Sequence, residues 1–114
     1  MAEKTVFQKI IDREIPASIV YEDEHCLAFP DIDPQAPTHL LLVPKKPIPS
    51  LTALTAADHA VVGHLLMVLP RIAQQLNLEA GFRVVCNCGE QAGQVVPHLH
   101  LHILAGRAFG WPPG

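Results

Sequence analysis

Three histidines stand two residues apart in the stretch PHLHLHIL, residues 97–104. His98, His100 and His102 alternate there with leucine and isoleucine, although the 114-residue chain has only seven histidines in all. An imidazole ring can ligate a metal ion, attack phosphorus or carbon as a nucleophile, or transfer a proton near neutral pH. Three of them in one short apolar run therefore indicate chemistry.

The alternation is that of a β-strand, in which successive side chains point to opposite faces. His98, His100 and His102 then form one row, with their Cα atoms about 6.5 to 7 Å apart. Leu99 and Leu101, with the isoleucine that follows, form the opposite row against the core. The pattern alone leaves three interpretations open: a polar solvent face, a metal site, and a site for phosphoryl transfer.

Neighbouring residues favour phosphoryl transfer. Asn87 and the loop Gly89–Gly93 directly precede the histidine row, and glycine lets backbone N–H groups approach a phosphate. Asp31 follows an apolar segment, where its carboxylate could accept hydrogen bonds from ribose hydroxyls. A metal site would usually bring a carboxylate or cysteine close to the histidines, and none occurs after Gly93. An apolar slot for a base could come from Phe7, Ile10, Phe29 and Ile32.

The elements that position these residues can be read from capping signals and hydrophobic spacing. Thr5 predicts the start of a short helix with Gln8 reaching back to it, and Thr55–Asp58 predicts the start of a long one. Apolar residues at helical spacing extend the long helix to Leu76, with Pro70 expected to kink or break it. Strands are expected at residues 19–22, 26–29, 39–43, 82–87 and 98–104, with an irregular tail at 105–114. The order predicts an α+β domain with helices packed on an antiparallel sheet.

Length, charge and cysteine content limit the class of protein. We expect residues 1–114 to form one domain, and a net charge of −3 gives no basic surface for nucleic acid. No run of 18 apolar residues is present and the charged N-terminus lacks a signal peptide's apolar region, so we expect neither a membrane span nor secretion. Three cysteines do not suggest a disulfide framework, and we expect a cytoplasmic location.

The remaining histidines and cysteines have ordinary interpretations. His59 and His64 are expected to be solvated or half-buried on the long helix, and His25 to lie at the surface of a hairpin. Cys86 and Cys88 are expected to be small core or interface residues.

The segment His98–Leu104 matches the pattern His-φ-His-φ-His-φ-φ, where φ is hydrophobic, and so resembles the histidine triad (HIT) family. The similarity extends over essentially the whole chain. TVFQKIIDREIPASIVYEDEHCLAFPDIDPQAPTHLLLVPKK resembles the N-terminal half of the Hint branch, the histidine triad nucleotide-binding proteins. AGQVVPHLHLHILAGRAFGWPPG resembles the C-terminal end of that branch.

This resemblance implies a HIT-like fold with an antiparallel sheet of about five strands, one short N-terminal helix and one long helix. It also implies a homodimer in which the sheet continues from one subunit into the other. The implied activity is that of a purine nucleoside phosphoramidase, a hydrolase of P–N bonds acting on adenosine or guanosine 5′-phosphoramidates. The nucleotidyl group would pass through a covalent intermediate on histidine, leaving AMP or GMP, with no cofactor and no metal.

The resemblance also assigns roles to individual residues. His100 is implied to be the nucleophile, and His98, His102 and His39 to bind charge and manage protons around it. His102 stands where the nucleotidyltransferase branch has glutamine, which argues for hydrolysis over transfer. The nucleotide is implied to contact, besides the triad itself, Phe29, Asp31, Ile32, Asn87, Gly93, Gln94, Val95, Val96 and, in the partner's site, Trp111.

One position departs from the branch. Many members have serine where this chain has Val95, and the serine hydroxyl contacts the α-phosphate or the leaving group. Val95 offers only its backbone N–H, so the leaving-group preference and the rate are expected to differ. Two alternatives to the enzyme remain: a non-catalytic nucleotide-binding or scaffold protein that keeps the pocket, and a metalloprotein that uses the same histidine row.

Overall fold

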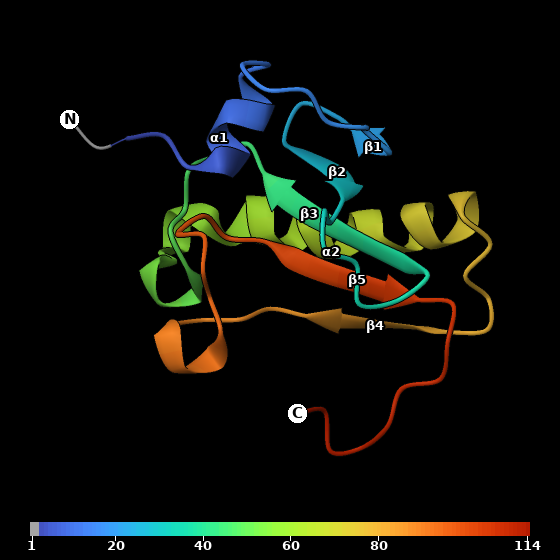
Figure 1. Ribbon diagram of the computed structural model, residues 1–114. Coiled ribbons are helices and arrows are strands. Elements are labelled where there is room, and N and C mark those ends of the chain that lie inside the picture. Colours follow the sequence, from blue (N-terminus) through green and yellow to red (C-terminus); the bar gives the residue numbers. More distant parts are fainter. Residues whose placement is uncertain (1–2) are drawn as a thin grey trace.

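A computed structural model describes residues 3–114, so the first two residues of the expected domain lie outside the described part. Two helices and five strands make up the fold (Figure 1). The helices are α1 (Val6–Ile11) and α2 (His59–Gln75). The strands are β1 (Tyr21–Glu22), β2 (Cys26–Pro30), β3 (Thr38–Pro44), β4 (Phe82–Val85) and β5 (Leu101–Ala105). Single 3₁₀ turns lie at Leu51–Ala53, Ala56–Asp58 and Glu90–Ala92. The predicted α+β class is thereby confirmed.

All five strands form one antiparallel sheet in the order β1-β2-β3-β5-β4. The pairing of β3 with β5 sets His39 opposite Leu104 and Leu41 opposite His102. Strands that are about 60 residues apart in sequence thus bring His39 and His102 into the centre of the sheet. β4 is an edge strand with β5 as its one partner among residues 3–114.

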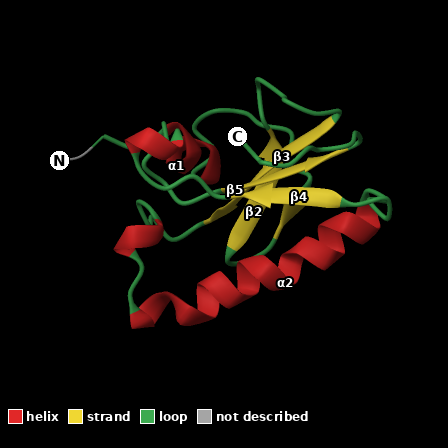
Figure 2. Ribbon diagram, turned by 90° about the horizontal axis from the view of Figure 1, so that it is seen from below, coloured by secondary structure: helices red, strands yellow, loops and turns green. Residues whose placement is uncertain are grey.

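The sheet lies between the two helices, which cover opposite faces (Figure 2). On one face α2 packs on the predicted apolar row, because Leu99, Leu101 and Ile103 share a buried cluster with residues of α2. On the other face α1 places Phe7 and Ile10 in a second buried cluster. The histidine row lies on the α1 side, where the Phe7 ring meets the His100 ring at a centroid distance of 4.9 Å.

The helix starts follow their predicted caps, with one correction. Thr5 Oγ1 accepts a hydrogen bond from the backbone N–H of Gln8 at 3.0 Å, as an N-cap should. The Gln8 side chain does not reach back to Thr5; it donates to Asp12 Oδ1 at 3.1 Å instead. At the second cap, Thr55 and Asp58 form the complete capping box, which starts the 3₁₀ turn that leads into α2.

The long helix continues through Pro70 to Gln75, so the alternative of a break at this residue is wrong. Of the helices in residues 3–114, none is both long enough and apolar enough to cross a membrane.

The last strand begins later than predicted, at Leu101 instead of His98. Pro97 has no N–H for a ladder, and the next two N–H groups bond outside the sheet, that of His98 to Val96 O and that of Leu99 to Ile48 O. Only the third triad histidine therefore lies within the strand proper, while the first two lie on the extended segment that enters it. The alternation of side chains is nevertheless kept, because the buried leucines stay on the α2 side.

Candidate functional site

A cavity of about 290 Å³ opens beside the histidine row. His100 and His102 form one wall, Asp31 and Ile32 a second, and Gly93 with Val95 and Val96 a third. The rest of the lining is apolar and comes from Val6, Phe7, Ile10 and Leu41. The structure therefore brings together nine residues singled out from the sequence around one space: two triad histidines, the acidic residue, three residues of the glycine loop and its end, and three of the apolar slot.

The ring of His100 is held by the backbone just before it. Its Nδ1 lies 2.7 Å from the carbonyl oxygen of His98, and a carbonyl can only accept, so Nδ1 carries the proton. The neutral ring then has its lone pair on Nε2, which makes no hydrogen bond to any residue in 3–114. His100 is buried, and the edge-on Phe7 ring packs against it. A fixed imidazole with a free lone pair is the form that a nitrogen nucleophile requires.

A relay of hydrogen bonds gives His102 the opposite tautomer. The backbone N–H of Gln35 donates to His39 Nδ1 at 3.0 Å, which leaves the neutral ring's proton on His39 Nε2. That nitrogen lies 2.9 Å from His102 Nδ1, so it donates there and the His102 proton resides on Nε2. With ring centroids 5.1 Å apart, His100 and His102 thus present an acceptor and a donor side by side.

Charges near the relay adjust the basicity of His102. Burial lowers the pKa of His102, the nearby His100 and His39 lower it further, and the Asp31 carboxylate acts in the opposite direction. Asp31 Oδ2 lies 3.4 Å from His39 Nε2, while Asp31 Oδ1 accepts from the backbone N–H of Asp33 at 2.9 Å. The carboxylate is therefore fixed at the site, 19% exposed, with capacity to accept further hydrogen bonds.

The loop before the triad is braced by its own polar side chains. Asn87 Nδ2 donates to Ala92 O at 2.7 Å, and Gln94 Nε2 donates to Pro49 O at 2.8 Å. Gly93 has a φ of 87°, a left-handed conformation that glycine adopts without strain. The N–H groups of Gly93 and Gln94 are used inside this turn, bonding to Glu90 O and Gly89 O.

The backbone N–H groups of Val95 and Val96 have no acceptor in the part of the chain that the structure describes. They are the donors that the loop leaves for a ligand, and both residues line the cavity.

Six of the residues singled out from the sequence lie outside this cavity, His39 among them. Phe29 is buried in the α1-side core against Phe7, and His98 is buried with its Nε2 donating to Pro44 O at 2.8 Å. Gln94 points into the loop that it braces. Asn87 lines a second, adjacent cavity, and Trp111 in the C-terminal tail is 84% exposed.

Gln35 was missed, although its backbone N–H sets the tautomer of His39. Nothing in the residue type reveals a main-chain donor. The signal available was the loop DIDPQAP, whose turn residues bring main-chain groups of residues 31–37 close to the following strand.

Two groups of side chains place possible metal ligands within 4.8 Å of one another. One is Asp31, His39 and His102, which together with His100 we call the triad cluster. Its two imidazole nitrogens are 2.9 Å apart and share a proton, whereas two nitrogens on one tetrahedral zinc lie about 3.3 Å apart. A metal bound there would have to replace the hydrogen bond that orients His102.

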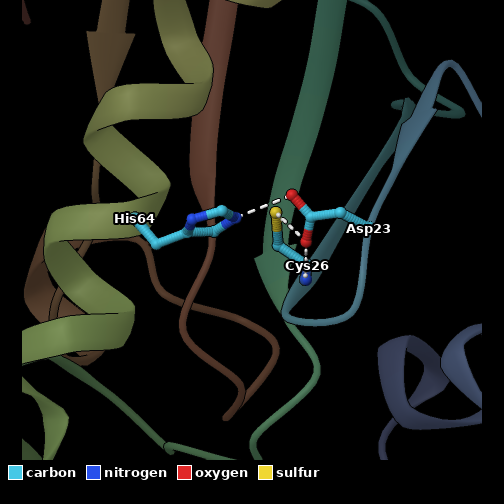
Figure 3. A group of neighbouring side chains, drawn as sticks. All are labelled: Asp23, Cys26 and His64. Carbon is cyan, nitrogen blue, oxygen red and sulfur yellow. Dashed lines mark hydrogen bonds and ion pairs between the residues drawn. The ribbon is translucent and has the colours of Figure 1, made fainter.

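The other group, which we call the turn cluster, is Asp23, Cys26 and His64 (Figure 3). His64 reaches from α2 to the β1–β2 turn, where its Nε2 lies 2.6 Å from Asp23 Oδ2. Asp23 Oδ1 also accepts from the backbone N–H groups of His25 and Cys26 at 2.8 and 3.0 Å. His64 was expected to be solvated or half-buried, and its side chain is 30% exposed. Its hydrogen bond with Asp23 was not expected.

Comparison with known proteins identifies the family. The sequence model of the HIT domain matches residues 12–109. The chain belongs to the HIT domain family. An uncharacterised HIT-like protein of Synechocystis is 60% identical over 114 residues, which is all of both chains. The crystal structure of a HIT family hydrolase from Legionella pneumophila has a TM-score of 0.94 and 46% identity, covering 97% of this chain and 100% of that chain.

A more distant HIT structure, the histidine triad nucleotide-binding protein of Candida albicans, has a TM-score of 0.82 and 30% identity over 96% of this chain and 83% of that chain. The predicted HIT fold is confirmed by these structures. All three triad histidines, His39 and Asp31 lie inside the matched HIT segment, whereas Trp111 lies just beyond it.

Proposed function

We propose that this HIT protein is a purine nucleoside phosphoramidase that hydrolyses the P–N bond of adenosine or guanosine 5′-phosphoramidates. The observation that carries the proposal is the pairing of tautomers at one cavity wall: a free lone pair on His100 Nε2 beside a proton on His102 Nε2. The hydrolase and nucleotide-binding names of two structural relatives agree with it.

The cavity offers each part of a nucleotide a matching group. Its apolar walls, with Ile32 at the mouth, suit a purine base, and the Asp31 carboxylate suits ribose hydroxyls. The free N–H groups of Val95 and Val96 and the His102 Nε2–H are donors for the α-phosphate oxygens. His100 Nε2 would then face phosphorus, which is where a nucleophile must lie.

The reaction proceeds in two balanced steps. His100 Nε2 forms a bond to phosphorus as the P–N bond breaks, and the bonding electron pair stays on the departing nitrogen. That nitrogen takes one proton from His102 Nε2 and leaves as a neutral amine; His102 acts as the acid in its imidazolium form, in which Nδ1 is protonated as well and the hydrogen bond from His39 Nε2 is given up. Water then attacks the nucleotidyl-histidine, displaces His100 and returns a proton to the cluster, so one water is consumed per turnover. The Asp31 carboxylate, near both rings of the relay, stabilises the transient positive charge.

The deciding experiment is a steady-state assay of wild type and His100→Ala on adenosine 5′-phosphoramidate, with a chelator present. We expect turnover by wild type and a loss of about 10⁴-fold or more in kcat for the variant. Full activity in His100→Ala would overturn the assignment of the nucleophile. Loss of wild-type activity on chelation, together with zinc or iron bound in stoichiometric amount, would favour the metalloprotein instead.

A non-catalytic nucleotide-binding protein is the second candidate, and Val95 is the observation that favours it. This side chain is 88% exposed at the cavity and has no hydroxyl for a phosphate or leaving group. Such a protein would bind AMP without releasing amine from a phosphoramidate, so the same assay separates it from the enzyme.

We also propose that the protein is a homodimer that continues its sheet through β4. Phe82 and Val84 are both more than a third exposed on this edge strand, and α2 exposes Leu66 and Met67. An unpaired apolar edge is a template for a second strand. Sedimentation of Val84→Lys should yield a monomer where wild type sediments as a dimer. We further propose a cytoplasmic location, one domain over the chain, and no nucleic-acid partner.

A further inference from the structure

A second cavity, of about 380 Å³, adjoins the first across the ring of His102, which lines both. The register of the sheet explains its position. β4 sets Val85 opposite His102 and Arg83 opposite Leu104, so residues of this edge strand lie beside the triad strand. His39, Asn87 and the C-terminal tail complete the walls. The catalytic face is therefore continuous with a space that the nucleoside pocket does not use.

Two arginines give this second cavity a positive charge. Arg83 donates to Gly110 O at 2.8 Å. Arg107 donates to Gln35 O through Nε and Nη2 at 3.2 and 3.1 Å and to Ala108 O through Nη1 at 3.0 Å, which leaves one N–H on each Nη for a ligand. Both guanidinium groups pack on the ring of Phe109, at 5.2 Å for Arg83 and 4.2 Å for Arg107. The aromatic ring and the carbonyls hold the two side chains in place without neutralising them.

Among residues 3–114, no acidic side chain forms an ion pair with either arginine. The residues that line the second cavity include no Asp or Glu. This is unusual in a chain whose net charge is −3. The first cavity has the opposite character, because its one charged side chain is the carboxylate of Asp31.

We propose that the second cavity binds the leaving amine and selects amines that carry an anionic group, a carboxylate or a phosphate. The inference rests on the proposed phosphoramidase function. With the nucleoside in the first cavity and phosphorus at His100, the amine must extend past His102, and the second cavity lies there. Guanidinium groups offer paired N–H donors that match the geometry of carboxylates and phosphates. The chemical step is unchanged, because the arginines bind the anionic group of the amine and not the reacting atoms.

The test compares three adenosine 5′-phosphoramidates that differ in one group of the amine: glycine, glycinamide and aminomethylphosphonate. We expect kcat/KM for the glycine and aminomethylphosphonate compounds to exceed that for glycinamide by about tenfold, with the larger value naming the preferred anion. The preference should shrink in 1 M salt, since both arginines are reached by solvent. In Arg83→Gln/Arg107→Gln the ratio should fall to about one. Arg71→Gln, an arginine on α2 away from both cavities, is the matched control and should keep the wild-type ratio.

The same ratio is measured by calorimetry on His100→Asn, which is expected to bind without turnover. This arm separates the two proposals, because a binding preference for the anionic compounds would support the anion site even if no phosphoramidate were hydrolysed. A ratio near or below one, both in wild-type turnover and in binding to His100→Asn, would overturn the inference and leave the phosphoramidase proposal intact. A ratio that survives the double arginine substitution would overturn it as well.

Discussion

The triad cluster and the turn cluster are built from the same kinds of side chain. Each places an aspartate against an imidazole, and the possible ligand atoms of Asp31, His39 and His102, like those of the turn cluster, lie within 4.8 Å of one another. They differ in whether their hydrogen-bonding atoms already have partners within the protein. Asp23 accepts from Tyr21, His25, Cys26 and His64, whereas in the triad cluster the Nε2 atoms of His100 and His102 have no protein partner within residues 3–114.

The pKa shifts in the turn cluster agree with this difference. Burial acts to raise the pKa of Asp23, but the hydrogen bonds from His25, His64 and Tyr21 outweigh it and hold the pKa well below its usual range. Burial, with the Asp23 charge beside it, raises the pKa of the Cys26 thiol to about 12, so the thiol stays protonated. The carboxylate and the thiol of the turn cluster are thus each held in one protonation state, and the contact of Asp23 with His64 ties the β1–β2 turn to α2. A cluster becomes a candidate site through unused hydrogen-bonding capacity that faces a cavity.

The largest difference between the two clusters should appear when the free donor of the triad cluster, the Nε2–H of His102, is removed. His102→Gln should lower kcat on adenosine 5′-phosphoramidate by about 10²- to 10³-fold, because the departing nitrogen loses its proton source. The variant should unfold within a few degrees of the wild-type Tm. Its plot of kcat against pH should lose the fall at high pH that deprotonation of His102 causes in wild type. Near-normal kcat with an unchanged pH profile would remove His102 from the mechanism.

The corresponding change in the turn cluster should act on stability instead. Asp23→Ala leaves the backbone N–H groups of His25 and Cys26 without their acceptor, and we expect the free energy of unfolding to fall by about 3 kcal/mol. Urea unfolding measures this, with Glu24→Ala, an exposed neighbour, as the control. Where both variants are folded, kcat should match wild type; a tenfold lower kcat in Asp23→Ala would mean that the two clusters are coupled.

A third test separates the histidine row, which includes His98, from the turn cluster by pH. Burial lowers the pKa of His98, so between its folded pKa and about 6.5 the unfolded chain binds more protons than the folded one. The stabilisation is complete above pH 6.5 and is lost as pH falls below it, whereas the lowered pKa of Asp23 affects stability only below about pH 4. The Tm should therefore decline from pH 7 to pH 5, and His98→Asn should decline less. An equal decline in the variant would place the effect on another group.

The smallest expected effect concerns the departure at Val95. Val95→Ser adds a hydroxyl at the open side of the cavity, next to the free N–H groups, and should raise kcat/KM by a few-fold. Val95→Thr is the matched variant, since it keeps the valine shape and adds the same hydroxyl. Equal rates for valine, serine and threonine would indicate that the backbone donors alone serve the phosphate.

The sequence predicted the parts of the fold that depend on local signals. Strand alternation placed Leu99, Leu101 and Ile103 in the core beneath α2, and Thr5 and Thr55 marked the helix starts. Boundaries failed where a tertiary bond overrides the local pattern, as at Leu99, whose N–H bonds to Ile48 O and so delays β5.

The residue types of the candidate site were predicted from the sequence, but the contacts between residues far apart in the sequence were not. His39 could be assigned only through the resemblance, because the β3–β5 register that joins it to His102 is a long-range property. The turn cluster gave no signal, since His64 lies 41 residues from Asp23. Arg83 and Arg107 belong to no sequence motif. The two arginines stand out only because the cavity that they line has no carboxylate.

The hydrogen bond from His100 Nδ1 to the carbonyl of His98 has a consequence for how the protein can change over time. The group that orients the nucleophile belongs to the main chain, so a substitution at position 98 exchanges the side chain and keeps that acceptor. The acceptor that orients the reactive nitrogen is therefore present whatever side chain stands at position 98, although the His98 side chain itself is buried and bonded to Pro44 O. The relay through His39 depends on a side chain, so a substitution of His39 removes it. Variants that drift toward pure binding should accordingly lose His39 or His102 first and keep an oriented ring at position 100.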